Sequence, residues 1–77
     1  MHTISVTKIN EVSKKLGKRI NQLRIDKKMT QEKLALEAGL NRAYIGYIER
    51  GERNPSTETV AKISKVLKVS LNELFKF

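Results

Sequence analysis

Apolar residues recur at steps of three and four along most of the chain, the spacing that places them on one face of an α-helix. The first such stretch is predicted to begin near Thr7 or Asn10 and to end near Lys27 and Lys28, whose positive charges suit the negative end of a helix. Gly17 interrupts this helix and weakens it by about 1 kcal/mol relative to alanine. The apolar stripe consists of Ile9, Val12, Leu16, Ile20 and Leu23.

Four shorter helices are predicted downstream, because each further apolar cluster follows a residue whose side chain can cap a helix. The cap residues are Thr30, Asn41, Ser56 and Ser70. Alternation of apolar and polar residues, the pattern of a strand, is essentially confined to residues 4–6. The pattern therefore predicts an all-α fold, with residues 1–77 forming one compact five-helix domain.

The second and third predicted helices are joined by a turn of only three residues, 39–41. Gly39 can adopt the left-handed conformation that a tight helix stop needs, and the small Ala35 lets the two helices approach closely. Two short helices joined in this way form a helix-turn-helix, predicted at about residues 31–50. A generic helical hairpin is the alternative, but it would not require Gln31, Ala35 and Gly39 at these offsets. The shared core is assigned to Leu40, Ile45 and Ile48.

The charge balance points to a polyanionic partner. Sixteen Lys and Arg residues face eight Asp and Glu residues, which gives a formal net charge of +8. Such an excess favours nucleic acid, although charge alone does not separate DNA from RNA or anionic lipid, and a merely lysine-rich solvated surface also fits.

The sequence does not support an enzyme, a metal- or cofactor-binding protein, a secreted protein or a membrane protein. There is no cysteine, no Gly-rich phosphate loop, no acid pair with an obvious cleft and only one histidine, His2, so we expect no enzyme, metal site or cofactor. The first residues do not resemble a signal peptide, and no apolar run approaches the roughly 18 residues of a membrane span. A cytoplasmic protein is expected.

Over about residues 16–75 the sequence resembles the phage repressor and Cro-type helix-turn-helix family, also called the xenobiotic-response-element group. The matching segments are residues 29–35 (MTQEKLA), 39–40 (GL), 44–45 (YI), 48–51 (IERG) and 54–56 (NPS). Residues 41–45 and 48–54 are similar to controller proteins of restriction-modification systems, small dimeric regulators that bind paired operator half-sites. Phage-type repressors and antitoxins share most of these positions.

The resemblance implies a repressor-like domain that regulates transcription by binding double-stranded DNA sequence-specifically, as a homodimer on a pseudo-palindromic operator. No small-molecule ligand or membrane partner is evident. The alternative is an antitoxin or protein-interaction module of the same fold, which would also bind a partner protein. An extra segment able to cover a toxin would favour that alternative, and this chain has only a few N-terminal residues to spare.

Base contacts are predicted on the first exposed turn of the third helix, where repressor-type helices touch base edges. Arg42 can bond guanine O6 and N7 together, although a phosphate contact or a solvated arginine is the simpler alternative. Ala43 can meet a thymine methyl group or merely keep the approach open. Gly46 is placed on the outer rim, where its lack of a side chain permits a close approach. The predicted base-contacting residues are Asn41, Arg42 and Ala43.

Contacts to the DNA backbone are implied mainly by the resemblance. In the family, the glutamine at position 31 bonds a phosphate, the loop after the third helix lies against phosphates, and controller-type proteins carry a DNA-contacting tyrosine at position 44. Tyr47 can reach the backbone or pack on the domain, and Ser56 can serve as a cap alone. The predicted backbone-contacting residues are Gln31, Tyr44, Tyr47, Arg50, Arg53, Asn54 and Ser56.

Two structural features complete the prediction. The family often pairs an arginine and a glutamate at positions 24 and 49, so we expect a partly buried, bidentate bridge between Arg24 and Glu49.

The C-terminal region, about residues 68–77, holds more apolar residues than one small core needs, which indicates a dimer interface; a monomer with a frayed tail is the alternative. The predicted interface residues are Val69, Leu71, Leu74, Phe75 and Phe77.

Overall fold

The computed structural model describes the backbone of residues 6–77 and the side chains from residue 11 onward; His2 and the side chain of Ile9 lie outside the described residues. Within this range the chain forms helices and no strand, so the predicted all-α fold of five helices is confirmed. The helices are α1 (Val6–Asp26), α2 (Gln31–Ala38), α3 (Arg42–Glu49), α4 (Thr57–Leu67) and α5 (Leu71–Leu74).

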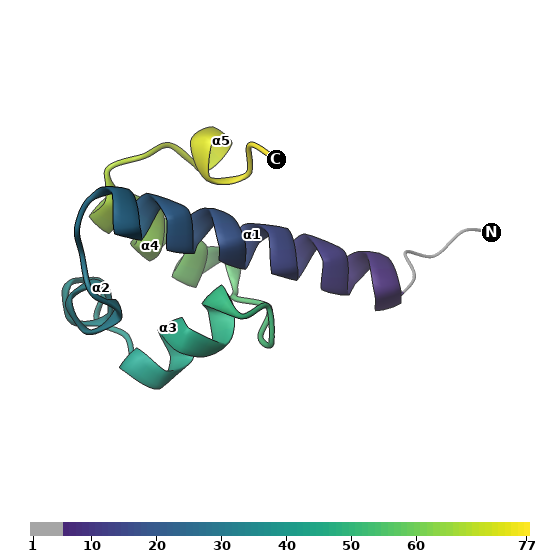
Figure 1. Ribbon diagram of the computed structural model, residues 1–77, viewed down its shortest axis with the longest axis horizontal. Coiled ribbons are helices and arrows are strands. Elements are labelled where there is room, and N and C mark those ends of the chain that lie inside the picture. The colour runs from purple at the N-terminus through teal and green to yellow at the C-terminus, as the bar shows by residue number, and fades with distance from the viewer. Residues whose placement is uncertain (1–5) are drawn as a thin grey trace.

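The long helix α1 runs through the middle of the molecule (Figure 1). It packs against α3 on one side and α5 on the other, while α2 contacts both α3 and α4. Its N-terminal part extends beyond the other helices (Figure 1), and Val12, predicted on the apolar stripe, is accordingly exposed. None of the helices in the described part of the chain is long and apolar enough to cross a membrane.

The core is built from the apolar faces that the helical spacing predicts. Every helix contributes at least one buried residue, which explains how so short a chain encloses a continuous apolar cluster. Leu40, in the turn between α2 and α3, packs against this cluster. The cluster comprises Leu16, Ile20, Leu34, Ala35, Ile45, Ile48, Val60, Ile63, Leu67 and Leu74.

Local capping sets the helix boundaries. At all four predicted cap residues the side-chain oxygen accepts a backbone N–H two or three residues later, at 2.7–3.1 Å. Each such cap contributes about 1 kcal/mol. Gly39 ends α2 in the left-handed conformation, with φ of 68°, as the turn prediction requires. The boundaries of α2 and α3 and the turn between them therefore follow directly from the local sequence.

Gly17 has a role that its helix propensity does not reveal. It is buried where the C-terminal end of α3 meets α1. A β-carbon at this position would collide with the Ile48 carbonyl oxygen and lie 2.8 Å from the Glu49 carbonyl oxygen. Since both atoms belong to the backbone, only glycine allows α1 and α3 to approach this closely. The residue predicted to weaken α1 is therefore required for packing the third helix against it.

Candidate nucleic-acid interface

The first turn of α3 presents the residues predicted to contact bases. Asn41 caps the helix by accepting the Ala43 N–H at 2.7 Å, and Asn41, Arg42 and Ala43 are all exposed. Ile45 and Ile48 point into the core and fix the rotation of α3 about its axis. The N-terminal end of α3 thus presents an amide, a guanidinium group and a methyl group side by side. No described residue covers them.

Gly46 does not lie on the outer rim, as predicted, but is buried. A β-carbon here would lie 3.1 Å from Arg50 Nη1 and 3.8 Å from Gln31 Oε1. The space left by the missing side chain is therefore used by the protein's own Arg50, which folds back over α3. The placement of Gly46 on the outer rim was wrong, because the end of the Arg50 side chain covers this position.

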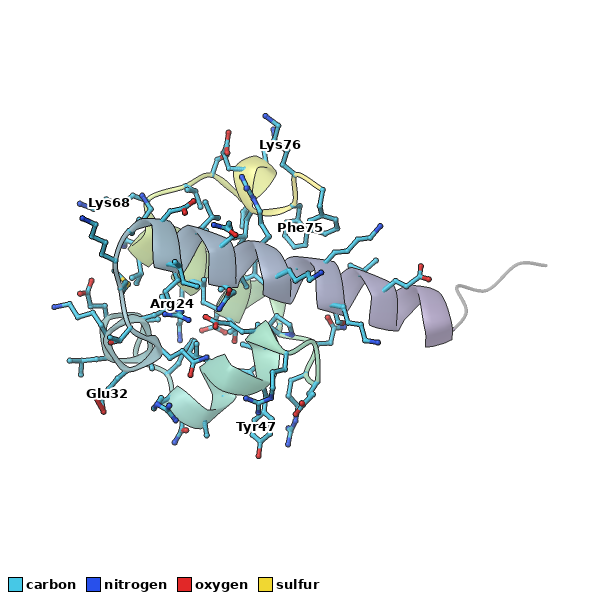
Figure 2. All side chains as sticks on the ribbon, viewed as in Figure 1. Arg24, Glu32, Tyr47, Lys68, Phe75 and Lys76 are labelled. Atoms are coloured by element: carbon cyan, nitrogen blue, oxygen red, sulfur yellow. The ribbon has the colours of Figure 1, made fainter. Side chains whose placement is uncertain are left out.

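Glu49 is the centre of a buried polar network that joins three helices. The structure brings it together with Arg24 in a bidentate bridge: Nε donates to Oε2 at 2.6 Å and Nη2 donates to Oε1 at 3.0 Å. The two side chains are only 11% and 4% exposed. Arg24 also donates from Nη1 to the Met29 carbonyl oxygen at 2.6 Å, which ties the end of α1 to the segment before α2. Figure 2 shows Arg24 pointing from α1 toward α3.

Two amides complete the network. Asn21 Nδ2 donates to Glu49 Oε1 at 2.8 Å, and Gln31 Nε2 donates to the same oxygen at 3.0 Å. Gln31, predicted to bind phosphate, is therefore bound to Glu49 through one proton of its amide, and a phosphate contact would have to use the other. Asn21 was not predicted; its position one turn before Arg24 on α1 was the only available signal.

The Glu49 pKa is lowered from the ordinary value of a glutamate. Burial acts to raise this pKa, but hydrogen bonds from Arg24, Asn21 and Gln31, together with the charge of Arg24, outweigh it. The carboxylate is thus charged at neutral pH and fully hydrogen-bonded, which fixes the C-terminal end of α3 relative to α1 and α2.

A basic and aromatic cluster lies at the C-terminal end of α3 and in the following loop. The guanidinium carbons of Arg50 and Arg53 lie 5.2 Å and 5.0 Å from the centre of the Tyr47 ring. Arg50 Nε also donates to Glu52 Oε2 at 2.9 Å. Tyr44, the tyrosine predicted nearer to DNA, is partly buried and packs against the core. Tyr47 is therefore the more accessible of the two.

The loop before α4 is held by side-chain hydrogen bonds. Ser56 caps α4 by accepting the Thr59 N–H at 3.1 Å and donates from its hydroxyl to Thr59 Oγ1 at 3.0 Å. Asn54 Oδ1 accepts a hydrogen bond from Ser13 on α1 at 3.4 Å. Arg53, Asn54 and Ser56 are exposed, so the loop is held at Asn54 and Ser56 while its polar groups remain accessible.

The C-terminal residues divide between the core and the surface. Leu74 is 0% exposed and belongs to the core, so it cannot form part of a dimer surface as predicted, because it already fills the space between α5, α1 and α4. Val69 is partly buried against the same core. By contrast, Leu71, Phe75 and Phe77 are 46%, 44% and 54% exposed.

No group of three or more histidine, cysteine, aspartate or glutamate residues that could hold a metal ion is found in the part of the chain that the structure describes. The exposed residues described above make the candidate site a surface of polar, basic and aromatic side chains on α3 and the loop after it.

Residues 20–74 match the family described as helix-turn-helix. The control protein C.BamHI of Bacillus amyloliquefaciens is 45% identical over 69 residues, which cover 88% of this chain and 85% of that protein. The restriction-modification controller protein C.AhdI from Aeromonas hydrophila is 40% identical with a TM-score of 0.79, over 80% of this chain and 94% of that one. C.Esp1396I bound to a 25 base pair operator site is 38% identical with a TM-score of 0.77, over 84% and 86% of the two chains. The chain belongs to the helix-turn-helix family.

Proposed function

We propose that this protein is a transcription regulator that binds double-stranded DNA sequence-specifically, of the kind that controls restriction-modification systems. The observation that carries the proposal is the exposed first turn of α3, with Asn41, Arg42 and Ala43, together with a basic cluster at the other end of the same helix. The similarity to a controller protein solved with its operator, and to the control protein C.BamHI, supports it. In this proposal α3 enters the major groove.

The proposed chemistry divides between base edges and phosphates. Arg42 has a planar fork of donors that matches guanine O6 and N7, and each such pair gives about 1–3 kcal/mol of discrimination against a wrong base. In this proposal the exposed Arg53 and Asn54 and the N-terminal end of α2 bind backbone phosphates, and such contacts set the position of α3 but carry no sequence information. Affinity should therefore fall steeply with salt.

Replacing Arg42 by alanine is expected to weaken binding to the operator by roughly tenfold or more, with little effect on a scrambled duplex. The operator is obtained by sequencing the DNA that the pure protein selects from a random pool, and affinities are measured by fluorescence anisotropy. By contrast, Arg53→Ala should weaken binding to both duplexes equally. It should also reduce the slope of log affinity against log salt concentration by about 1, the change expected when one phosphate contact is lost. Equal losses on both duplexes for Arg42→Ala would contradict its base-reading role.

We also propose that two copies associate through the exposed apolar residues at the C-terminal end. The rings of Phe75 and Phe77 lie 6.1 Å apart, and Leu71 is exposed on α5. Figure 2 shows Phe75 and Tyr47 on opposite sides of α1, so this surface would leave the DNA-binding cluster free. A two-fold dimer would place two copies of α3 on half-sites one helical turn, roughly 34 Å, apart on a pseudo-palindromic operator.

Replacing Phe75 by glutamate is expected to shift the protein from dimer to monomer, because a charge would be buried in an apolar interface. Light scattering at high micromolar concentration measures the mass in solution. Leu36→Glu is the matched control, since Leu36 is 76% exposed on α2, away from the C-terminal region, and its replacement should leave the dimer intact. A monomeric wild-type protein would contradict the proposed dimer.

The proposal has three further parts. The protein acts by binding and not by catalysis, it does so in the cytoplasm, and residues 1–77 form one domain. The match to the helix-turn-helix family supports the first two parts, and the apolar cluster that all the helices from α1 to α5 share supports the third.

A further inference from the structure

The cluster around Tyr47 holds two positive charges close together. The guanidinium groups of Arg50 and Arg53 both lie about 5 Å from the centre of the Tyr47 ring, within the range of cation–π attraction. Figure 2 shows Tyr47 projecting away from the body of the protein. The negative face of the ring offsets part of the repulsion between the two cations and restricts long side chains that would otherwise move freely. A pair of guanidinium groups held in this way is suited to binding an anion.

Gly46 contributes to the same arrangement by leaving space on α3 for the end of the Arg50 side chain. Because it lacks a β-carbon, Arg50 Nη1 can lie 3.1 Å from the point where that atom would be. Arg50 is therefore positioned by Tyr47 on one part of its side chain and by the surface of α3 on another. The cluster is built from residues at the C-terminal end of α3 and in the loop that follows it, whereas the proposed base-contacting turn lies at the N-terminal end of the same helix.

One acidic residue already occupies part of this site. Glu52 Oε2 accepts a hydrogen bond from Arg50 Nε at 2.9 Å, and both side chains are about half exposed. A carboxylate oxygen and a phosphate oxygen accept the same donors of a guanidinium group, so they compete for Arg50. An exposed pair of this kind contributes little to stability, which makes it easy to displace.

We propose that Tyr47, Arg50 and Arg53 form a single binding site for a backbone phosphate of double-stranded DNA, and that Glu52 occupies Arg50 until the phosphate displaces it. This inference rests on the proposed DNA-binding function. Tyr47 acts as a positioning residue for the two arginines, and Glu52 lowers the affinity for every duplex. Because phosphates carry no sequence information, the ratio of specific to non-specific affinity is unaffected by Glu52.

The test compares Glu52→Gln with Glu37→Gln. Each substitution removes one negative charge and breaks one exposed ion pair, since Glu37 pairs with Lys33 on α2 at 3.2 Å. Glu52→Gln should tighten binding to both the selected operator and a random-sequence duplex by roughly three- to tenfold, and Glu37→Gln by much less. In an Arg50→Ala background the effect of Glu52→Gln should shrink to that of Glu37→Gln.

Tyr47 is tested by a conservative and a disruptive variant. Tyr47→Phe keeps the ring and should bind both duplexes within roughly twofold of the wild type, whereas Tyr47→Ala should lose roughly tenfold on both. An equal loss for Tyr47→Phe and Tyr47→Ala would assign the effect to the hydroxyl and overturn the positioning role. Circular dichroism of each variant reports whether it is folded, and the Glu52 comparison does not depend on Tyr47→Ala folding.

The outcomes separate this inference from the proposed function. If the wild-type protein binds neither duplex, the proposed function fails. If the wild-type protein binds DNA but Glu52→Gln matches Glu37→Gln, or if the effect of Glu52→Gln persists in full without Arg50, only the phosphate-site inference is overturned.

Discussion

Replacing Gly17 by alanine is expected to destabilise the protein by about 3 kcal/mol, even though alanine is the better helix former by about 1 kcal/mol. The added β-carbon would meet the backbone carbonyl oxygens of Ile48 and Glu49, at the point where the end of α3 rests on α1. Backbone atoms cannot move aside by a change of rotamer, so the two helices must separate. Separation would also disturb the contact between Glu49 and Arg24, which lies beside it.

Urea denaturation followed by circular dichroism measures this effect. Gly46→Ala is the matched control, because Gly46 is also a buried glycine within a helix, but its β-carbon would meet only side-chain atoms, the movable ends of Arg50 at 3.1 Å and of Gln31 at 3.8 Å. We expect Gly46→Ala to change stability by less than about 1 kcal/mol. An increase in stability for Gly17→Ala would contradict this account. It would show that helix propensity, and not the close approach of α1 and α3, determines the effect of the substitution on stability.

Replacing Arg24 by alanine is expected to destabilise the protein by about 3–5 kcal/mol, because it leaves the Glu49 carboxylate buried without its charged partner. Asn21 and Gln31 would still donate hydrogen bonds, but they are neutral. The double variant Arg24→Met, Glu49→Leu should lose less than Arg24→Ala alone, since it removes the buried charge together with its partner. A double variant less stable than the single one would contradict this account of the network.

Acidification gives an independent check on the Glu49 network. The Glu49 pKa is lower in the folded protein, so the charged carboxylate stabilises the fold above the ordinary pKa of glutamate, and this contribution is lost as the pH falls through the folded value. In Arg24→Ala the remaining burial would favour the protonated form, so the variant should gain relative stability in acid. The stability difference between wild type and Arg24→Ala should therefore narrow as the pH falls, first above the ordinary glutamate pKa, where the variant gains stability, and further below it, where the wild type loses stability, as measured by urea denaturation across the pH range.

The sequence by itself determined the local structure of this protein. The positions of α2 to α5 followed from caps that bond to residues only two or three positions away, and the turn followed from Gly39, whose conformation is set within its own residue. The helical spacing identified Ile45 and Ile48 as inward-facing and hence placed Arg42 on the exposed turn. Each of these predictions depends on interactions within one helix or one turn, which the order of residues specifies.

Only the tertiary structure decided which residues meet across helices. Asn21 and Glu49 are 28 positions apart, and nothing in the spacing of α1 shows that an amide on one of its faces lies against the end of α3. In the same way, helix propensity predicted only that Gly17 weakens α1, Gly46 was expected to be exposed, and Leu74 was expected in the dimer interface. In the folded protein all three residues are buried by packing between elements of the same chain. The physical reason is that burial and close backbone approach depend on how separate helices are placed against one another, and that placement is set by the whole core at once.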